Sequence, residues 1–273
     1  MAAALPARDE RFDGRIAPRL FQRAGRGKWA ALLVSLVSIG CGSDPTGRVN
    51  AAAPQNTGFL ARSVVVDGQT RNYSVFIPFS YTPEQTWPAI VFLHGIGEAG
   101  SDGRKCLNVG LAPVIADQPS TFSFIAIFPH SDGDWKGADR ERLVLACLDD
   151  CLRDLAIDPD RIALTGISTG GYGTWHIGAL HPDQFSALVP LCAYKDSDDV
   201  ARLTRMPVWA FHNSGDPFVW SSDSREMVQR INAAGGQAKY TQYGEVGHDC
   251  WSRAYREQDL WNWLLEQRSQ SSH

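Results

Sequence analysis

The stretch Gly166-Ile167-Ser168-Thr169-Gly170 decides how this chain is expected to fold. A short apolar run, residues 161–165, precedes it, and a helix-like segment, residues 171–181, follows it. This order predicts a strand, a sharp turn with a serine at its apex, and a helix. A serine there adopts a strained backbone conformation, and the flanking glycines have no side chain to collide with the strand and the helix. The hydroxyl is then held in the open at one end of a sheet. The alternative is an ordinary glycine-rich turn into a helix.

The composition is that of an ordinary globular protein. The chain has 273 residues, a formal net charge of −4 and 44% hydrophobic residues, which suits one domain or at most two. Because basic residues are not in strong excess, nucleic acid is not an expected partner. The longest apolar run is too short to span a bilayer.

The first 41 residues resemble a targeting segment rather than part of a fold. Six basic residues between positions 11 and 28 precede an apolar stretch, residues 29–39, and small residues and Cys41 follow. This arrangement predicts a lipoprotein-type signal over residues 1–41, with Cys41 as the lipidated residue. The alternative is an N-terminal core helix. Residues 42–56 are rich in Gly, Ser, Pro, Ala and Asn, which predicts a flexible linker before a folded domain at 57–273.

These features predict an exported protein, either a bacterial cell-envelope lipoprotein or a periplasmic or secreted protein. Membrane contact is expected only through the N-terminal lipid. The sequence does not predict an oligomeric state.

The cysteines leave the disulfide pattern open. Five cysteines follow Cys41, namely Cys106, Cys147, Cys151, Cys192 and Cys250. An odd number leaves at least one thiol free unless it pairs between chains. Spacing cannot fix the connectivity, but a bridge from Cys106 to Cys147 or Cys151 is one plausible pairing. Cys147 and Cys151 have too few further ligands nearby to suggest a metal site, so no metal is expected.

From residue 57 onward, strand-like and helix-like segments alternate. Residues 59–67 and 71–77 have period-2 apolar patterns around Asp67-Gly68, which predicts an antiparallel hairpin. Further strands are predicted at 88–93, 122–128, 161–165, 185–191, 207–211 and 238–243, and helices at 140–155, 171–181, 222–234 and 252–268. The fold class is therefore α/β, with a leading hairpin and a mostly parallel sheet that has helices on both faces. Residues 192–206 leave no room for a lid domain.

Three further loops are expected to meet the serine at the carboxyl edge of this sheet. Residues 94–100 form a glycine-rich turn, residues 212–217 contain Asp216, and residues 244–249 contain His248. The order Ser168, Asp216, His248 is the order found in α/β-hydrolases. The alternatives are that Asp216-Pro217 is only a turn and that His248 is an ordinary loop histidine.

At these motifs the chain resembles the α/β-hydrolase superfamily, in particular its esterase and "predicted peptidase" group, near polyhydroxybutyrate-depolymerase-like and feruloyl-esterase-like enzymes. The resemblance covers residues 58–267. It rests on Leu93-His94-Gly95, residues 166–173, His181-Pro182-Asp183-Gln184-Phe185, Asp216-Pro217 and Gly247-His248-Asp249. Asn213 departs from the family, which usually has glycine there.

The resemblance implies a serine hydrolase that cleaves carboxylic esters through an acyl-enzyme, without a cofactor. Ser168 would be the nucleophile, His248 its base and Asp216 the group that orients the imidazole. The backbone N–H groups of Thr169 and Ile96 would form the oxyanion hole. A serine peptidase on the same scaffold is one alternative, and a non-catalytic binding protein is another.

Four aromatic residues are predicted to border an open cleft: Trp135, Tyr172, Trp220 and Trp251. Aromatic rings at a rim suit small-molecule or polymeric ester substrates through stacking. The alternative is that these rings fill the core.

If Cys41 is lipidated, radiolabelled fatty acid should enter the full-length protein expressed in bacteria and should not enter the Cys41→Ala variant. Incorporation is measured by autoradiography of the purified proteins. Equal labelling of both would contradict the lipoprotein prediction.

Overall fold

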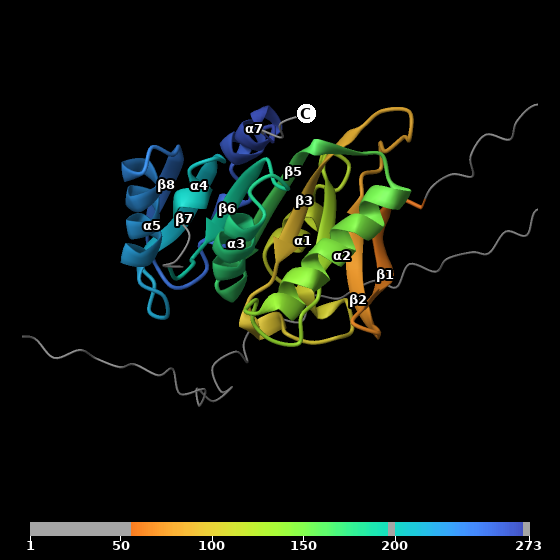
Figure 1. Ribbon diagram of the computed structural model, residues 1–273, viewed down its shortest axis with the longest axis horizontal. Coiled ribbons are helices and arrows are strands. Elements are labelled where there is room, and N and C mark those ends of the chain that lie inside the picture. The colour runs from red at the N-terminus through yellow and green to blue at the C-terminus, as the bar shows by residue number, and fades with distance from the viewer. Residues whose placement is uncertain (1–55, 196–199, 270–273) are drawn as a thin grey trace, which may run out of the picture. The chain divides into compact units, whose positions relative to one another are not determined.

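A mixed sheet of eight strands forms the centre of the part of the chain that the computed structural model describes, residues 56–195 and 200–269 (Figure 1). The strands occur in the spatial order β1-β2-β4-β3-β5-β6-β7-β8. Their bounds are β1 (Gly58–Val66), β2 (Gln69–Ile77), β3 (Trp87–Leu93), β4 (Ile125–Pro129), β5 (Ile157–Ile167), β6 (Ala187–Leu191), β7 (Val208–Gly215) and β8 (Ala238–Val246). The predicted signal segment 1–41, including Cys41, and the predicted linker up to residue 55 lie outside the described residues.

The leading hairpin is confirmed. Strands β1 and β2 pair antiparallel from Gly58 with Ile77 to Val66 with Gln69. The two residues between them, Asp67 and Gly68, have φ angles of 51° and 74°. This is the geometry that a two-residue hairpin turn requires, because its twist matches that of the strands.

The remaining sheet is parallel from β4 to β8, as the alternating pattern predicts. Strands β3 and β4 are buried along their whole length, which explains why their sequences are continuous apolar runs rather than alternating ones. The carboxyl ends of β3, β5, β7 and β8 share one edge of the sheet, so the loops that follow them come together there.

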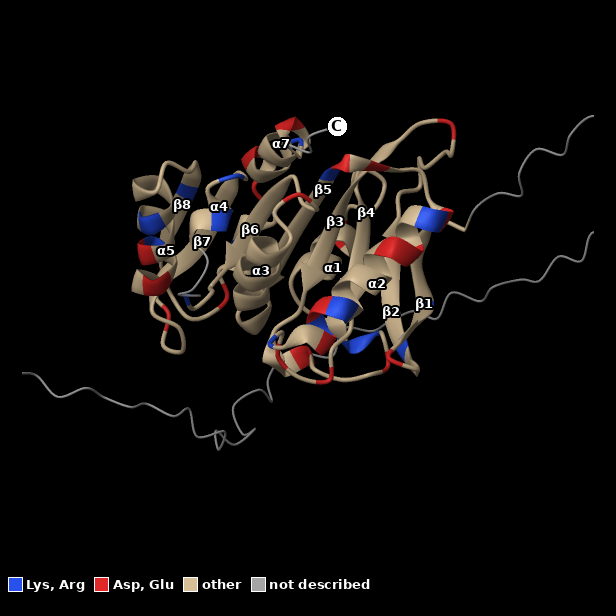
Figure 2. Cartoon of the chain, viewed as in Figure 1, with Lys and Arg blue, Asp and Glu red and all other residues tan. Residues whose placement is uncertain are grey.

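Helices cover both faces of the sheet (Figure 1). One face packs against α2 (Ala138–Asp154), α3 (Thr169–Leu180), α4 (Val200–Leu203) and α5 (Ser221–Ala233). The other packs against α1 (Leu111–Asp117), α6 (Trp251–Ala254) and α7 (Gln258–Glu266). Two short 3-10 turns, η1 (Ile96–Glu98) and η2 (Lys105–Leu107), lie between β3 and α1. Residues of both charge signs occur along α2 and α5 (Figure 2), as expected for helices with one solvent face.

The C-terminal helix differs from the prediction, because residues 252–268 do not form one helix. The chain breaks between α6 and α7 at Tyr255, whose side chain is fully buried. The Tyr255 hydroxyl lies 2.8 Å from the Thr165 hydroxyl on β5, and the Tyr255 carbonyl accepts a hydrogen bond from the Trp261 indole. Burying this tyrosine turns the chain, so that α7 packs through Leu260, while Leu265 on the same helix is 41% exposed.

The plausible pairing of Cys106 with Cys147 or Cys151 is wrong. Cys106 belongs to the core on one face of the sheet, and Cys147 and Cys151 belong to the core on the other. The sheet separates them, and all three are free and buried. The disulfide instead joins Cys192 to Cys250.

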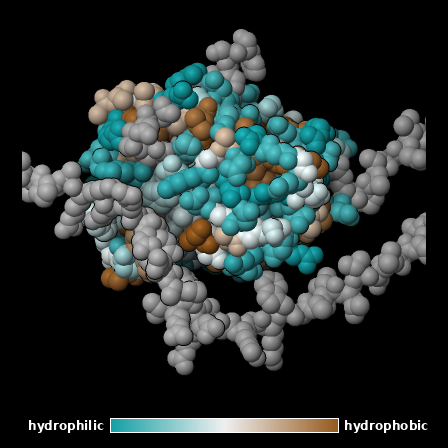
Figure 3. Space-filling model, turned by 60° about the horizontal axis from the view of Figure 1, so that its bottom comes forward, coloured by the Kyte–Doolittle hydropathy of each residue, from teal (hydrophilic) through white to brown (hydrophobic). Residues whose placement is uncertain are grey.

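The visible surface is mostly hydrophilic, with small separate apolar areas (Figure 3). Within the described residues, no helix combines the length and the apolar character needed to cross a membrane.

The packing of α7 can be tested with two substitutions on that helix, one at a buried leucine and one at an exposed leucine that serves as the control. Leu260→Ala should lower the free energy of unfolding by about 2–5 kcal/mol, because it leaves a cavity in the core. Leu265→Ala should change it by less than about 0.5 kcal/mol, because that side chain lies at the surface and is 41% exposed. Urea unfolding followed by circular dichroism measures both. Similar losses in the two variants would contradict this description of α7.

Candidate active site

Ser168 occupies the predicted sharp turn between β5 and α3. Its φ and ψ angles are 55° and −117°, a strained conformation that costs about 1–3 kcal/mol for a residue other than glycine. The Ser168 N–H donates to the Leu191 carbonyl on β6, and its carbonyl accepts from the Tyr172 N–H on α3. These bonds hold the serine at the carboxyl edge of the sheet.

The two elbow glycines are required by close backbone contacts. A Cβ on Gly166 would collide with the Gly170 carbonyl, and a Cβ on Gly170 would collide with the carbonyl oxygens of Leu93 and His94. Positions 166 and 170 therefore have no room for a side chain, because the start of α3 lies directly against the end of β3. The same contact brings the turn after β3 beside the serine, because a Cβ placed on Gly95 would lie 3.6 Å from the Ser168 Cβ.

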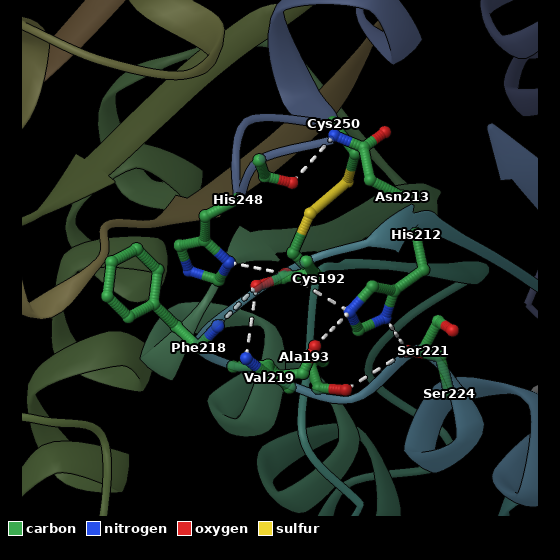
Figure 4. Close-up of polar contacts among 12 residues, drawn as sticks. Cys192, Ala193, His212, Asn213, Phe218, Val219, Ser221, Ser224, His248 and Cys250 are labelled. Atoms are coloured by element: carbon green, nitrogen blue, oxygen red, sulfur yellow. Dashed lines mark hydrogen bonds and ion pairs between the residues drawn. A yellow bond between two sulfur atoms is a disulfide. The ribbon is translucent and has the colours of Figure 1, made fainter. Parts of the chain in front are cut away.

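His248, labelled in Figure 4, forms a hydrogen-bonded pair with Asp216, in which the carboxylate is buried and the imidazole is partly exposed. The His248 Nδ1–H donates to Asp216 Oδ2 over 2.6 Å, and the Asp216 side chain is fully buried. The other oxygen, Oδ1, accepts from the N–H groups of Phe218 and Val219 at 2.9 and 3.0 Å. Because Nδ1 carries the proton toward the carboxylate, Nε2 of neutral His248 is left as the basic nitrogen.

The environment of Asp216 keeps it ionised. Burial raises the pKa of this carboxyl, but hydrogen bonds from His212, His248 and the two backbone N–H groups together hold its pKa well below the ordinary value. An ionised carboxylate can fix the orientation of His248 and stabilise the imidazolium form.

The loop that carries His248 is tied down on both sides. The Asn213 side chain on β7 donates to the Gly247 carbonyl over 3.0 Å, and the Cys250 N–H donates to the His248 carbonyl. The disulfide joins Cys250 to Cys192, the residue that follows β6. Asn213, the departure from the family pattern, therefore fastens the histidine loop to β7.

The turn after β3 is oriented by His94. Its Nδ1–H donates to the Gly95 carbonyl over 2.8 Å, and its Nε2 accepts from the Ser131 N–H. The Glu98 N–H also donates to the Gly95 carbonyl. Since a trans peptide points its C=O and N–H in opposite directions, two donors on this carbonyl direct the Ile96 N–H away from His94.

Thr169 is the first residue of α3, so its N–H has no carbonyl partner one turn earlier in the helix. Its hydroxyl oxygen is buried without a hydrogen-bond partner among the described residues. The N–H directly after the serine is thus available to a ligand at the elbow.

The four aromatic rim predictions have different outcomes. The prediction for Trp135 is wrong: the side chain is 0% exposed, because it packs against Gly173 of α3 and donates its indole N–H to the His94 carbonyl. Trp220 is 74% exposed, and Tyr172 is half-buried, with its ring stacked on that of Tyr194.

Trp251 lies at the site, since its ring is 5.3 Å from that of His248. Sequence reasoning missed Phe218, which is exposed and contacts the same imidazole at 5.6 Å. The sequence signal that could have indicated Phe218 is its position two residues after Asp216.

Sequence reasoning also missed His212 as part of the site. Its Nε2 lies 3.2 Å from Asp216 Oδ2, and both side chains are fully buried. The two lie four positions apart, His212 in β7 and Asp216 just after its end, and this spacing gives no signal unless the chain is known to turn back there.

Cys192, Asp216 and His248 bring ligand-type atoms within 4.8 Å of one another, but they do not fit a metal ion. The Cys192 sulfur is bonded in the disulfide. The Asp216 oxygens already accept hydrogen bonds from His248 and from the backbone. Cys192 and Asp216 therefore offer no free ligand atom to a metal ion.

Comparison with known proteins gives structural matches and no others: no family model matches the chain, and no curated protein matches it. A thermostable esterase is 30% identical, with a TM-score of 0.71 over 77% of this chain and 63% of that protein. An acylaminoacyl peptidase from Pyrococcus horikoshii is 12% identical, with a TM-score of 0.60 over 80% of this chain and 44% of that protein. A ferulic acid esterase from Anaeromyces mucronatus, solved with ferulic acid, is 11% identical, with a TM-score of 0.55 over 82% of this chain and 96% of that protein.

The sheet order, the leading hairpin and these matches define an α/β-hydrolase fold. Within that class the chain is similar to esterases and to acylaminoacyl peptidases. The chain spans less than two thirds of the length of the thermostable esterase and of the acylaminoacyl peptidase.

His94 should make the stability of the protein depend on pH. Burial lowers the pKa of His94 to about 4, from an ordinary value of 6.5. In the unfolded chain His94 is therefore protonated below about pH 6.5, whereas in the folded protein it is protonated only below about pH 4. Stability should fall over this range by up to about 3 kcal/mol. Urea unfolding at several pH values should show a shallower fall for His94→Asn, and identical pH dependence in both proteins would contradict the assignment.

Proposed function

We propose that the protein is a serine carboxylesterase that works through an acyl-enzyme on Ser168. The observation that carries the proposal is the 2.6 Å hydrogen bond between His248 and the buried carboxylate of Asp216. It occurs at the same sheet edge as a serine in a strained elbow. Support also comes from the 30% identity to a thermostable esterase.

In the first step His248 Nε2 takes the proton from the Ser168 hydroxyl as the serine oxygen attacks the ester carbonyl carbon. The imidazolium that forms is stabilised by Asp216, whose carboxylate faces Nδ1. The carbonyl π bond opens, and its electron pair becomes a negative charge on the carbonyl oxygen. This chemistry uses side chains and backbone alone and requires no cofactor.

The negative charge on that oxygen would be stabilised by the N–H groups of Ile96 and Thr169. Support for Ile96 comes from the two donors that hold the Gly95 carbonyl and so set the direction of the next N–H. Support for Thr169 comes from its place at the start of α3. Losing one such donor typically raises the barrier by about 3–4 kcal/mol.

The tetrahedral intermediate collapses when the bond from the carbonyl carbon to the leaving oxygen breaks, and the imidazolium gives its proton to the departing alcohol. A water then repeats the attack, with His248 as its base, and releases the acid and free Ser168.

The preferred substrates are small-molecule or polymeric esters with apolar or aromatic groups. Phe218 and Trp251 flank His248, and Ile96 and Trp220 are exposed. Such rings can stack on aryl groups or pack on alkyl groups at an open rim.

The proposed setting of this activity is the bacterial cell envelope or the space beyond it. Residues 1–41 would direct export, Cys41 would carry the lipid, and residues 42–56 would tether the domain. An open rim would then face substrates outside the cell.

Ser168→Ala should reduce hydrolysis of a p-nitrophenyl acyl ester by at least about 10³-fold, because the acyl group has no oxygen to bind. The thermal midpoint should stay close to that of the wild type. A fluorophosphonate probe should label the wild type at Ser168, located by peptide mapping, and should not label the variant.

Ser63→Ala is the matched control, since Ser63 is an exposed serine on β1, and it should keep full turnover and labelling. Turnover or labelling that persists in Ser168→Ala would exclude this serine as the nucleophile. The same wild-type protein tested on a panel of acyl esters and the corresponding peptides separates an esterase from a serine peptidase. Faster turnover of the peptides would reassign the function.

A further inference from the structure

Asp216 is held by two histidines, and the mechanism above uses only one of them. His212, at the end of β7, places Nε2 3.2 Å from Asp216 Oδ2, the same oxygen that accepts from His248 at 2.6 Å. The side chains of His212 and Asp216 are both 0% exposed. In Figure 4 the rings of His248 and His212 lie on opposite sides of the point where their dashed contacts converge.

The neighbours of His212 decide which of its nitrogens carries a proton. Nε2 faces two acceptors, Asp216 Oδ2 and the Val219 carbonyl at 3.1 Å. An unprotonated nitrogen there would point its lone pair at both, so Nε2 carries the hydrogen. Nδ1 lies 2.8 Å from the Ser224 hydroxyl oxygen on α5, and that hydroxyl donates its own hydrogen to the Ala193 carbonyl at 3.0 Å. The ring is thus clamped between a carboxylate on one side and a serine on the other.

We propose that His212 is a positioning residue of the active site: its Nε2–H holds the Asp216 carboxylate in the orientation that serves His248. This inference rests on the proposed function. The site would then comprise Ser168, His248, Asp216 and a second imidazole, that of His212. The contact with Ser224 fixes the rotation of the His212 ring.

The arrangement has a chemical consequence, because the two histidines share one oxygen. The hydrogen bond from His212 withdraws electron density from Oδ2 and contributes to the low pKa of Asp216, against the opposing effect of burial. Without it the carboxylate becomes more basic, and the imidazolium form of His248 is held more tightly. The activity should then be lost at a higher pH as the solution is acidified. The carboxylate also gains freedom to rotate, which should lower kcat.

Other charged groups near these rings are engaged elsewhere. Asp249 accepts hydrogen bonds from Ser252, and Glu245 pairs with Arg253. The rings of Phe218 and Trp251, which contact His248, carry no charge, and the nearby Cys192 sulfur is bonded in the disulfide. Asp216 is therefore the charged partner through which His212 acts on His248.

Two substitutions at position 212 separate positioning from a purely structural role. In His212→Asn the short amide occupies the place of Nδ1, so the contact with Ser224 can persist while the donor to Asp216 is lost. In His212→Gln the longer amide puts an N–H near the place of Nε2 and can restore that donor. His181→Asn is the control, since His181 bonds Glu141 over 2.7 Å at the far end of α3, outside the site.

We expect His212→Asn to lower kcat by about 10- to 100-fold, the range found when outer hydrogen-bond partners of metal-bound histidines are removed. KM should change little, and the acid limb of the kcat/KM profile should move to higher pH. His212→Gln should recover most of kcat and return the acid limb toward the wild type, and His181→Asn should match the wild type in both. Thermal melts establish that each variant is folded, and if His212→Asn does not fold, Ser224→Ala should shift the acid limb in the same direction by less.

Histidine ring ¹⁵N NMR, recorded as a function of pH without substrate, provides a readout that does not depend on turnover. The pH at which the His248 ring gains its proton should rise in His212→Asn and not in His181→Asn. An unchanged acid limb and an unchanged His248 titration in folded His212→Asn would overturn the inference. A wild type without Ser168-dependent hydrolysis would overturn the proposed function instead, and the NMR titration would still decide whether His212 acts on His248 through Asp216.

Discussion

The structure of the site depends on one steric constraint, the direct contact between the start of α3 and the end of β3. Gly170 lies against the carbonyl oxygens of Leu93 and His94, with no space for a side chain. This contact bends the chain sharply enough to force Ser168 to a positive φ angle. It also brings the Gly95 turn beside the serine. The candidate nucleophile and the candidate oxyanion donors are thus positioned by one backbone contact between elements about 75 residues apart in the sequence.

A second group of contacts gathers the other half of the site around one buried carboxylate. Asp216 accepts from His248, from His212 and from two backbone N–H groups, so it joins the end of β7 and the loop after β8 to the loop before α5. Asn213 and the disulfide from Cys192 to Cys250 fasten the same histidine loop. A carboxylate with this many donors is costly to misplace, because each lost bond leaves a buried polar group unpaired. These contacts connect the two loops that carry the candidate acid and the candidate base.

Much of the fold was predictable because its signals are local. The Asp67-Gly68 turn, the apolar run of β3 and the glycines of the elbow each depend on residues adjacent in the chain. Where the prediction failed, a distant contact decided the outcome. The C-terminal helix is interrupted at Tyr255 because this side chain is buried against Thr165 of β5. Cys106 cannot reach Cys147 or Cys151 because the sheet lies between the two cores. Trp135 is buried because α3 and the His94 carbonyl close over it.

The sequence by itself determined the class of fold, the strained serine and the order of the candidate serine, acid and base along the chain, since these follow from spacing and from the conformations open to glycine. Only the tertiary structure decided which side chains meet. It paired Asp216 with His248, added His212 on the same oxygen, and put Phe218 rather than Trp135 beside the imidazole. The physical reason is that hydrogen bonds and ring contacts depend on distances of a few ångströms between loops. Residue spacing along a chain leaves those distances free until the sheet and its helices are assembled.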